Sequence, residues 1–564
     1  MNIESTESGI GQSVGTDIPK RISRDTAAQA GRRAWLAPVF ATVAYFAVVC
    51  LWQWLAHAPQ AAFDTYPDEP AHYVSGLLIR DYLVEEFPKS PVRFAGEYYS
   101  RVPAFAIGYW PPVFYAVEGA WMLLFGTSRA AALALIGWIG AGSAALIFVS
   151  VRPLLGPIGA FGMGFLFLMS PIIRWSTGAV MVDLPVTLLS FAAALAYARY
   201  LDSEKIRWSL AFAVLASLTI LTKSNGAFLA LLPPIGIVLT RKWRLLRSFS
   251  FWIAPLVVVA LCTPWFWMTT AFVSKGFEGL ERRALPVALR QLASGLVRNL
   301  TWVLPFALYG AWRVLRGFGF QPLSGLAAMC IAQPAALAIL LIAAPPEIEP
   351  RYLTPLLPPM LVLGAYGIRD IASRFRSREQ FAAQAMVGVL VIATVAMTAA
   401  QFRPAPGNPF QSFARMIASE RYGSVLVPAD AEGALIAEIC SRGYHRDAFL
   451  IRPSKLMSYQ SWNGTSYRAR YASSQEVRAL FDRMPVDLIV ARMDSYPQMP
   501  RHAALLRDML LASPDRWRQV SSVTSASGKQ YAAYQAVNSA PFSPAALKQQ
   551  VDHPLDQLKR SGKK

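Results

Sequence analysis

The chain has 564 residues, of which 54% are hydrophobic and only 16% are charged. Soluble proteins carry about 25% charged residues, so this composition excludes a series of soluble domains, a disordered chain and a disulfide-rich secreted scaffold. It predicts a polytopic membrane protein with a soluble part attached. In a soluble protein, the net charge of +20 would suggest binding to nucleic acid. No zinc-ligand spacing or RNP motif accompanies this charge, so basic cytoplasmic loops of a membrane protein are the better interpretation.

The chain up to residue 402 predicts a membrane domain. Residues 1–33 are polar, and we expect a disordered cytoplasmic segment there. Because about 20 apolar residues cross a bilayer as a helix, residues 34–402 predict about eleven transmembrane helices. The predicted spans are 34–56, 130–150, 154–172, 184–201, 208–222, 226–240, 249–269, 300–315, 323–344, 352–368 and 382–402.

One further apolar run, 108–126, is ambiguous, and the charges of the loops decide how it lies. If it does not cross the membrane, the cationic run 241–247 and the other basic loops face the cytoplasm, as the positive-inside rule requires. If it crosses, these loops all lie outside. We therefore predict a juxtamembrane or re-entrant helix at 108–126, and we expect the region after the last span to be extracytoplasmic.

Residues 405–540 differ from the rest because charged residues occur throughout them. Strands and helices alternate along this region, which predicts a small extracytoplasmic α/β domain. The expected strands are 424–429, 487–492 and 530–537, and the expected helices are 431–442, 475–484 and 501–513. Residues 541–564 are predicted to form a disordered basic tail.

The first outer loop contains the sequence YPDEPAHYVSGLLIRDYLVEEF at 66–87. Asp68 is placed to cap a helix, with Glu69 and Pro70 in its first turn. Apolar residues then mark one face, which we expect to lie on the membrane. These residues are Val74, Leu77, Leu78, Tyr82 and Phe87. Taken alone, a capped surface helix explains this motif about as well as a reaction site does.

The same topology brings further charged residues to the outer face. They are Asp183, Lys223, Glu349 and Arg351. Each has an ordinary explanation, such as a helix-start carboxylate or a snorkelling lysine. Together they suggest a site for transfer from a phosphate-linked lipid donor, because a carboxylate can deprotonate a hydroxyl while Lys and Arg stabilise a departing phosphate. One base and direct displacement imply inversion at the sugar.

These motifs occur in an order found in a known group. The chain resembles the GT-C glycosyltransferases, in particular the protein O-mannosyltransferase and lipid A aminoarabinose transferase type (glycosyltransferase family 39/83-like). The matching motifs are Asp68-Glu69, WPPVFY (110–115), SPIIRWSTGAVMVDLP (170–185), LTKSNG (221–226) and EPRYLTPLLPP (349–359). The resemblance covers most of 34–402 and implies an extracytoplasmic domain after the membrane part.

The resemblance implies roles for the acidic residues and the cations. Asp68 would be the catalytic base, Glu69 would support it or orient the acceptor, and Asp183 would assist at the site. The residues implied for binding the donor phosphate are Lys223, Arg351 and Tyr352, with Lys89, Arg93 and Arg101 as weaker candidates. Some members of the group use a divalent cation and others do not. Asp68 and Asp183 would be its ligands, although the sequence has no His/Cys ligand cluster.

Three more residues are expected to support the site or the acceptor. They are His72, Tyr73 and Glu349. The group commonly has one residue between Asp-Glu and a His or Arg, whereas here two residues precede His72. An ordinary juxtamembrane histidine is therefore the alternative interpretation of His72.

We therefore predict an integral membrane glycosyltransferase in a bacterial cytoplasmic (inner) membrane, with its site on the periplasmic face. Its partners would be a polyprenyl-phosphate-sugar donor carrying a hexosyl or pentosyl group, membrane lipids, and a glycan, lipid or protein acceptor, but no nucleic acid. A transporter or flippase of lipid-linked sugars is the alternative, although repeated halves and mid-membrane polar groups are not evident. A third hypothesis is an enzyme-like scaffold whose C-terminal domain recruits partners.

Overall fold

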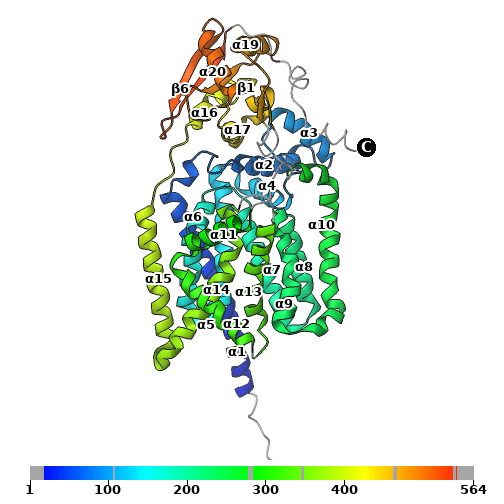
Figure 1. Cartoon of the computed structure of the whole chain (residues 1–564), viewed down its shortest axis with the longest axis vertical. Coiled ribbons are helices and arrows are strands. Elements are labelled where there is room, and N and C mark those ends of the chain that lie inside the picture. The colour runs from blue at the N-terminus through cyan, green and yellow to red at the C-terminus, as the bar shows by residue number, and fades with distance from the viewer. Residues whose placement is uncertain are drawn as a thin grey trace, which may run out of the picture.

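The computed structural model describes residues 18–105, 108–276, 284–319, 321–343, 348–460 and 467–537, and Phe542. A bundle of helices carries a smaller domain with a sheet on one of its ends (Figure 1). Buried side chains of both parts, such as Leu77 in the bundle and Leu435 in the smaller domain, belong to one hydrophobic cluster. The smaller domain is therefore docked on the bundle. Residues 1–17 and almost all of the predicted basic tail lie outside the described residues.

The helices of the bundle lie where the apolar runs predict them. They are α1 (Ile18–Leu55), α5 (Arg129–Met169), α7 (Asp183–Ser203), α8 (Ile206–Ile220), η2 (Ser224–Leu231), α9 (Leu232–Thr240), α10 (Phe249–Gly276), α12 (Leu304–Phe318), α13 (Gly325–Ala343), η5 (Pro350–Leu356), α14 (Leu357–Ala372) and α15 (Glu379–Gln401). Within the described residues, 6 segments are long and apolar enough to cross a membrane, by length and composition. The number of crossings stays a prediction.

Two of these segments are too long for a single crossing. The segment Arg129–Met169 has 41 residues, about 60 Å of helix, whereas a bilayer core is about 30 Å thick. Gly156, with φ 69° and ψ 178°, breaks it. Arg376, with φ 40° and ψ −101°, breaks the segment that contains α14 and α15. Each break separates two helices where the sequence predicts two spans.

Helix α1 begins well before the first apolar run. Its first residue is Ile18, so the prediction of a disordered segment is wrong for residues 18–33. This part of the chain contains several Ala and Arg residues, which are good helix formers and let the helix extend ahead of the apolar run.

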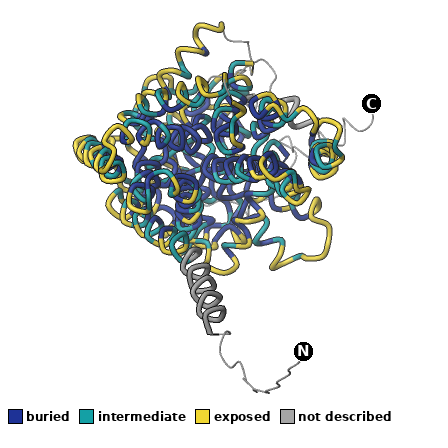
Figure 2. Tube along the Cα trace, turned by 90° about the horizontal axis from the view of Figure 1, so that it is seen from below, coloured by how far each residue is buried: buried dark blue, intermediate teal, exposed yellow. Residues whose placement is uncertain are grey.

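Seen from the end opposite the smaller domain, buried residues fill the centre of the bundle and exposed residues surround it (Figure 2). Basic residues of the loops are paired with acids: Lys242 with Glu204 at 2.9 Å, and Arg313 with Asp370 at 2.7 Å. Helices α10 and α15 both begin at this end (Figure 1). The predicted cytoplasmic loops therefore lie opposite the smaller domain.

Short helices cover the other end of the bundle, beneath the smaller domain (Figure 1). They include α2 (Glu69–Glu85), α3 (Pro91–Arg101) and α4 (Val113–Phe125), and the chain also forms α6 (Pro171–Thr177) and α11 (Leu285–Leu300). Helix α4 has 13 residues, about 20 Å, and lies beside α2 rather than along the bundle. This arrangement agrees with the prediction of a juxtamembrane helix at 108–126.

The first part of helix α2 is enclosed by protein, whereas Val84 near its end and Phe87 just after it are 54% and 65% exposed. Val74, Leu77 and Leu78 are at most 3% exposed. Gly119 on α4 allows this helix to pack closely against α2, since a Cβ on Gly119 would lie 2.9 Å from the carbonyl oxygen of Gly76 on α2. The expected membrane-facing side is therefore wrong for Val74, Leu77 and Leu78, because α4 and α17 (Glu432–Ser441) of the smaller domain cover this part of α2.

The smaller domain confirms the predicted α/β fold. Its elements are α16 (Phe410–Glu420), β1 (Ser424–Leu426), α17 (Glu432–Ser441), β2 (Phe449–Ile451), α18 (Pro453–Leu456), β3 (Ser458–Gln460), β4 (Tyr467–Ala469), α19 (Ser474–Arg483), β5 (Leu488–Arg492), α20 (Arg501–Ala512), β6 (Trp517–Thr524) and β7 (Gln530–Ala536). The main sheet has the order β2-β1-β5-β7-β6. Strand β1 is parallel to β2 and β5, while β7 is antiparallel to β5 and β6. Strands β3 and β4 form a separate hairpin.

A buried carboxylate on α2 joins the smaller domain to the bundle. Asp81 Oδ2 lies 2.7 Å from His445 Nε2, and Asp81 Oδ1 lies 3.2 Å from Arg446 Nη2. At the start of the same helix, Pro70 packs tightly against Gly433. A Cβ added to Gly433 would lie 2.8 Å from the Cβ atom of Pro70. Helix α2 thus touches the smaller domain near both of its ends.

Candidate active site

Asp68 occupies the N-cap position of α2, but its side chain does not cap the helix. Instead, Asp68 Oδ2 lies 3.0 Å from Arg351 Nη2, and its side chain is 34% exposed. The predicted capping contact is therefore wrong. Pro70 in the first turn has no N–H to be capped, which removes one of the donors that a capping carboxylate would satisfy. The carboxylate is free to face Arg351.

Arg351 on η5 is the centre of the first group of contacts. Its Nε atom lies 2.9 Å from Glu349 Oε2, and its side chain is buried. Tyr66 and Tyr352 donate their hydroxyl protons to Glu349 over 2.6 Å and 3.1 Å. Burial alone would raise the pKa of Glu349, but the hydrogen bond from Tyr66 and the charge of Arg351 lower it, so Glu349 is a carboxylate.

Lys223 and Asp183 form the second group of contacts. Lys223 Nζ lies 2.6 Å from Asp183 Oδ1, and it also lies 4.6 Å from the centre of the Tyr352 ring. Burial lowers the pKa of Lys223, although the Asp183 carboxylate opposes that change. Asp183 Oδ2 is buried and has no hydrogen-bond partner in the described part of the chain.

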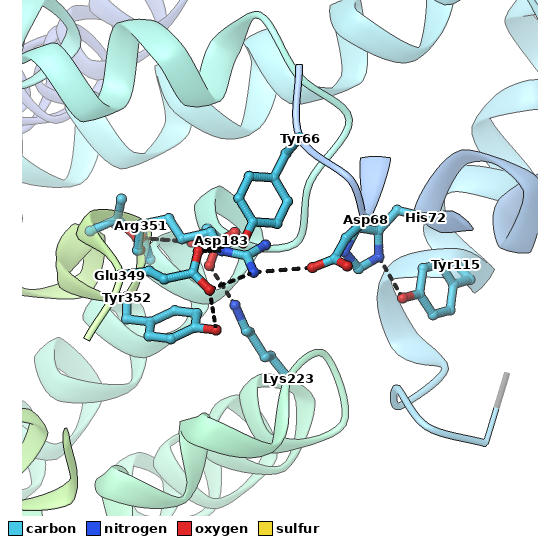
Figure 3. A network of polar contacts seen from close by, with 11 residues as sticks. Tyr66, Asp68, His72, Tyr115, Asp183, Lys223, Glu349, Arg351 and Tyr352 are labelled. Carbon is cyan, nitrogen blue, oxygen red and sulfur yellow. Dashed lines mark hydrogen bonds and ion pairs between the residues drawn. The ribbon is translucent and has the colours of Figure 1, made fainter. Parts of the chain in front are cut away.

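The two groups are continuous, since Tyr352 contacts both cations and joins the two ion pairs (Figure 3). We call them together the polar network. Its members are Tyr66, Asp68, Asp183, Lys223, Glu349, Arg351 and Tyr352. They come from four places in the chain: the start of α2, the start of α7, the loop after α8, and the residues at and just before η5. The sequence motifs that supply them therefore converge in space.

Glu69, the neighbour of Asp68, has a different environment. Glu69 is fully buried and pairs with Arg129 at the start of α5, where Oε1 lies 2.7 Å from Nη1. The backbone N–H groups of Val180 and Thr65 donate to the same carboxylate, each over 3.0 Å. Arg129 also donates to the carbonyl oxygen of Gly178. This pair ties the loop before α2 to the turn before α7.

His72 lies on α2 one turn after Asp68. Its Nδ1 atom is 2.7 Å from the Tyr115 hydroxyl, and its ring stacks on Trp110 with centroids 4.2 Å apart. Both aromatic residues belong to the WPPVFY motif. The N–H of Val113 in this motif donates to the carbonyl oxygen of Leu221, two residues before Lys223. The motif therefore fixes His72 and ties it to the Lys223 loop.

Tyr73 is buried beside α4 and does not join the polar network. Its hydroxyl donates to the carbonyl oxygen of Thr127, just before α5. The structure thus places Tyr73 in the packing of α2 against the bundle rather than at the reacting groups.

The weaker phosphate candidates also lie outside the polar network. Lys89 and Arg93 are 63% and 60% exposed and pair with Glu86 at the turn between α2 and α3. Arg101 donates to the carbonyl oxygen of Arg446 in the smaller domain. These cations already have partners outside the polar network. Glu86 in the turn after α2 pairs with Lys89 and Arg93, and Arg101 on α3 faces the smaller domain.

Sequence reasoning missed Tyr66 and Arg129. Tyr66 packs its ring 3.9 Å from the Arg351 guanidinium and donates to Glu349. An aromatic residue two positions before Asp68 was a weak signal for it. Arg129 is a single cation at the outer start of a predicted span, which the positive-inside rule does not favour. That departure was the signal for a partner acid.

The residues at this site do not fit a divalent cation. Asp183 and Asp68 are each already paired with a cation, Lys223 and Arg351. The two positive groups stand where a metal ion would have to approach the carboxylates. The described residues contain no group of 3 or more His, Cys, Asp or Glu side chains that could hold a metal ion. The positive charges paired with Asp183 and Asp68 are those of Lys223 and Arg351.

Comparisons with known proteins address the fold of the chain. The family model for dolichyl-phosphate-mannose-protein mannosyltransferase matches residues 110–268. The crystal structure of ArnT from Cupriavidus metallidurans in the apo state aligns with 87% of this chain and 97% of that chain, at 15% identity and a TM-score of 0.55. The chain has the GT-C fold. The resemblance expected from the motifs is confirmed at the level of fold.

A second structure of the same protein gives the same result. ArnT from Cupriavidus metallidurans bound to undecaprenyl phosphate aligns with 89% of this chain and 99% of that chain, at 14% identity and a TM-score of 0.56. No curated protein sequence matches the chain. The comparison thus covers both the GT-C bundle and the smaller domain.

Proposed function

We propose that this chain is an integral membrane glycosyltransferase that moves a sugar from a polyprenyl-phosphate carrier to an acceptor. The observation that carries this proposal is the polar network, in which a half-buried carboxylate, Asp68, pairs with the buried Arg351, and the partly buried Lys223 belongs to the same network. The GT-C fold supports it, as does the partial match to a mannosyltransferase family. One structure with this fold is bound to undecaprenyl phosphate, which supports a polyprenyl phosphate as the carrier.

The polar network supplies the groups that the transfer needs. Asp68 takes the proton of the acceptor hydroxyl, and the acceptor oxygen then attacks the anomeric carbon of the sugar. The bond between that carbon and the phosphate oxygen breaks, and the carrier phosphate leaves with the electron pair. Arg351 and Lys223 neutralise the leaving phosphate. Because the acceptor oxygen displaces the phosphate in a single step at the anomeric carbon, the sugar configuration is inverted.

The pairing of Asp68 with Arg351 has a consequence for the order of binding. In the structure without substrate, Arg351 is shared between Asp68 and Glu349. A donor phosphate competes with Asp68 for the same guanidinium, since both are anions that accept its N–H groups. Donor binding therefore releases Asp68 to act as a base, and the acceptor reacts second.

The sidedness of the loops supports a reaction at the outer face. The polar network includes Asp68, the N-cap residue of α2, and α2 lies at the end of the bundle that carries the smaller domain, opposite the basic loops (Figure 1). By the positive-inside rule, those loops face the cytoplasm. We infer a bacterial cytoplasmic membrane, with the site on its periplasmic face, a hexosyl or pentosyl donor, and a glycan, lipid or protein acceptor. A transporter of lipid-linked sugars gains no support, because the network lies at one end of the bundle.

Purified protein in lipid vesicles tests this proposal. The vesicles would carry a polyprenyl-phosphate sugar with a radioactive sugar, and an envelope extract would supply acceptors. We expect label in a new glycosidic product, and no label in the product when Asp68 is replaced by Asn. Movement of the labelled lipid across the bilayer without a new glycosidic bond would overturn the proposal in favour of transport.

A further inference from the structure

His72 is held in one orientation by two aromatic residues. The residue is 2% exposed, and its ring stacks on Trp110 at an interplanar angle of 28°. Its Nδ1 atom is 2.7 Å from the Tyr115 hydroxyl. His72 lies beside Asp68, with Tyr115 on its far side (Figure 3). The ring therefore has one nitrogen bound to Tyr115 and one nitrogen left for another partner.

The contact with Tyr115 decides which nitrogen of His72 carries the proton. Tyr115 is fully buried, and in the described part of the chain its hydroxyl forms a hydrogen bond only with His72. A buried O–H that donated nowhere would lose a hydrogen bond, so Tyr115 donates and Nδ1 accepts. In a neutral imidazole the other nitrogen is then the donor. Nε2 of His72 therefore carries the proton.

The surroundings keep both groups neutral. Burial lowers the pKa of His72 well below its ordinary value, and the charges of Lys223 and Arg351 lower it further. Burial also raises the pKa of Tyr115 well above its ordinary value. The imidazole is therefore uncharged while the phenol keeps its proton, which is the state that the hydrogen-bond argument requires.

Asp68 offers the complementary group. Asp68 Oδ2 is bound to Arg351, whereas Asp68 Oδ1 has no hydrogen-bond partner among the residues described. The backbone N–H of His72 donates to the backbone carbonyl oxygen of Asp68, so the two residues are one helical turn apart. Side chains four residues apart share one face of a helix. An N–H donor and a carboxylate acceptor thus lie next to each other.

We propose that His72 Nε2–H and Asp68 Oδ1 together bind one hydroxyl group of the acceptor. The hydroxyl oxygen accepts from His72 while its proton points to Asp68. This inference rests on the proposed function and deepens it, because it names the acceptor group. When the acceptor oxygen attacks, its proton passes to Asp68 Oδ1, and the His72 proton stays on Nε2.

This arrangement selects the chemical class of the acceptor. A hydroxyl has both a proton to give and lone pairs to accept the His72 proton. A protonated amine has no lone pair and cannot accept that proton. The site therefore favours an alcohol of a glycan, lipid or protein over an amine.

Nitrogen NMR of the full-length protein in detergent tests the proton assignment directly. Histidine labelled with ¹⁵N gives distinct shifts for a protonated and an unprotonated ring nitrogen, and the His72→Gln spectrum identifies the signal of His72. We expect a protonated Nε2 and an unprotonated Nδ1 at neutral pH, and a mixture of both neutral forms in Tyr115→Phe. An Nδ1–H form or a doubly protonated ring in the natural protein would overturn the proposal.

Two replacements of His72 test the role of Nε2–H in transfer. Gln carries an amide N–H at a position similar to Nε2, whereas the shorter Asn does not reach it. Transfer of labelled sugar to endogenous membrane acceptors should fall on the order of ten-fold more in His72→Asn than in His72→Gln. Equal losses in the two variants would overturn the proposal. Replacement of the exposed His57 by Gln is the matched control and should leave transfer unchanged.

Binding of undecaprenyl phosphate separates failure of this inference from failure of the proposed function. The natural protein and both His72 variants should bind this lipid with equal affinity, because Arg351 and Lys223 are intact in all three. If the natural protein neither binds the lipid nor transfers sugar, the proposed function is wrong. If it does both while His72→Asn transfers normally, only the role of His72 is wrong.

Discussion

Asp68 and Glu69 are adjacent in the sequence, yet they belong to two different regions of the molecule. Asp68 is 34% exposed and shares Arg351 with Glu349, while Glu69 is fully buried and pairs with Arg129. Asp68 has an oxygen without a partner among the described residues, whereas backbone N–H groups and Arg129 occupy both oxygens of Glu69. This difference supports our proposal that Asp68 takes part in the reaction and that Glu69 positions it.

The buried pair explains how distant motifs stay aligned. Glu69 binds the N–H of Val180, and Asp183 follows three residues later at the start of α7. The same carboxylate binds the N–H of Thr65, just before Asp68. Glu69 thus fixes the spacing between the two loops that bring Asp68 and Asp183 to the polar network. We propose that it acts through these loops rather than on the substrate.

Replacing Asp68 by Asn should have the largest effect on transfer. A lost general base lowers the rate by about 10²- to 10⁴-fold, while the half-exposed position of Asp68 predicts little change in stability. Turnover of a labelled donor and the thermal unfolding temperature would be measured on the same preparation. Full turnover in this variant would remove Asp68 from the role of base.

Replacing Glu69 by Gln should show the opposite balance. Arg129 would be left buried without its counter-ion, at a cost of about 3–5 kcal/mol in the free energy of unfolding. We expect a lower unfolding temperature, with loss of transfer that follows from loss of folded protein. An Arg129→Gln variant should reproduce this effect. If Glu69→Gln unfolds like the natural protein and still loses transfer, the assignment of Glu69 to positioning is wrong.

Replacing Asp81 by Asn extends the comparison to the far end of α2. Burial opposes ionisation, but His445 and Arg80 lower the pKa of Asp81 below its ordinary value. Because the pKa of Asp81 is lower in the folded protein, its ionised form stabilises the fold. This contribution is fully present above the unfolded pKa of about 3.9 and is lost as the pH falls through the folded pKa. The variant should lose about 2–3 kcal/mol of docking at neutral pH.

Hydrogen exchange of α17 would measure this docking from neutral pH to acid. We expect faster exchange in Asp81→Asn at neutral pH, and convergence with the natural protein once Asp81 is protonated. Identical exchange of the two proteins at neutral pH would show that Asp81 does not hold the smaller domain.

Replacing Lys89 and Arg93 by Ala should have the smallest effect. Their charges are exposed and pair only with acids at the surface, which makes such pairs worth less than about 1 kcal/mol. Donor affinity and the unfolding temperature should both stay close to those of the natural protein. A large loss of donor affinity would place these cations in the path of the carrier phosphate.

The sequence predicted the positions of the helices because their apolar runs are long and unbroken. The α/β domain was also predictable, since β1, β5 and β7 fall on the expected apolar runs. The environment of α2 was not predictable. Its apolar face at Val74 and Leu77 has the pattern of a membrane-surface helix, but α4 and the smaller domain cover it. Local periodicity shows which face is apolar and not what covers it.

The polar network was predicted in part for a similar reason. Loop charges sent Asp68, Asp183, Lys223 and Arg351 to one face, and the structure brings them together. Charge alone could not separate Asp68 from Glu69, because the difference between them arises from Arg129, sixty residues later in the chain. Partners that are distant in sequence decide which of two adjacent acids is buried.

The affinity of the Asp68→Asn variant for undecaprenyl phosphate tests the account most directly. Asn does not compete for Arg351, so the variant should bind this lipid at least as tightly as the natural protein does, while sugar transfer is lost. Titration of both proteins in detergent, with turnover measured in parallel, would give the two results. Much weaker lipid binding in the variant, or turnover at the natural rate, would contradict the account.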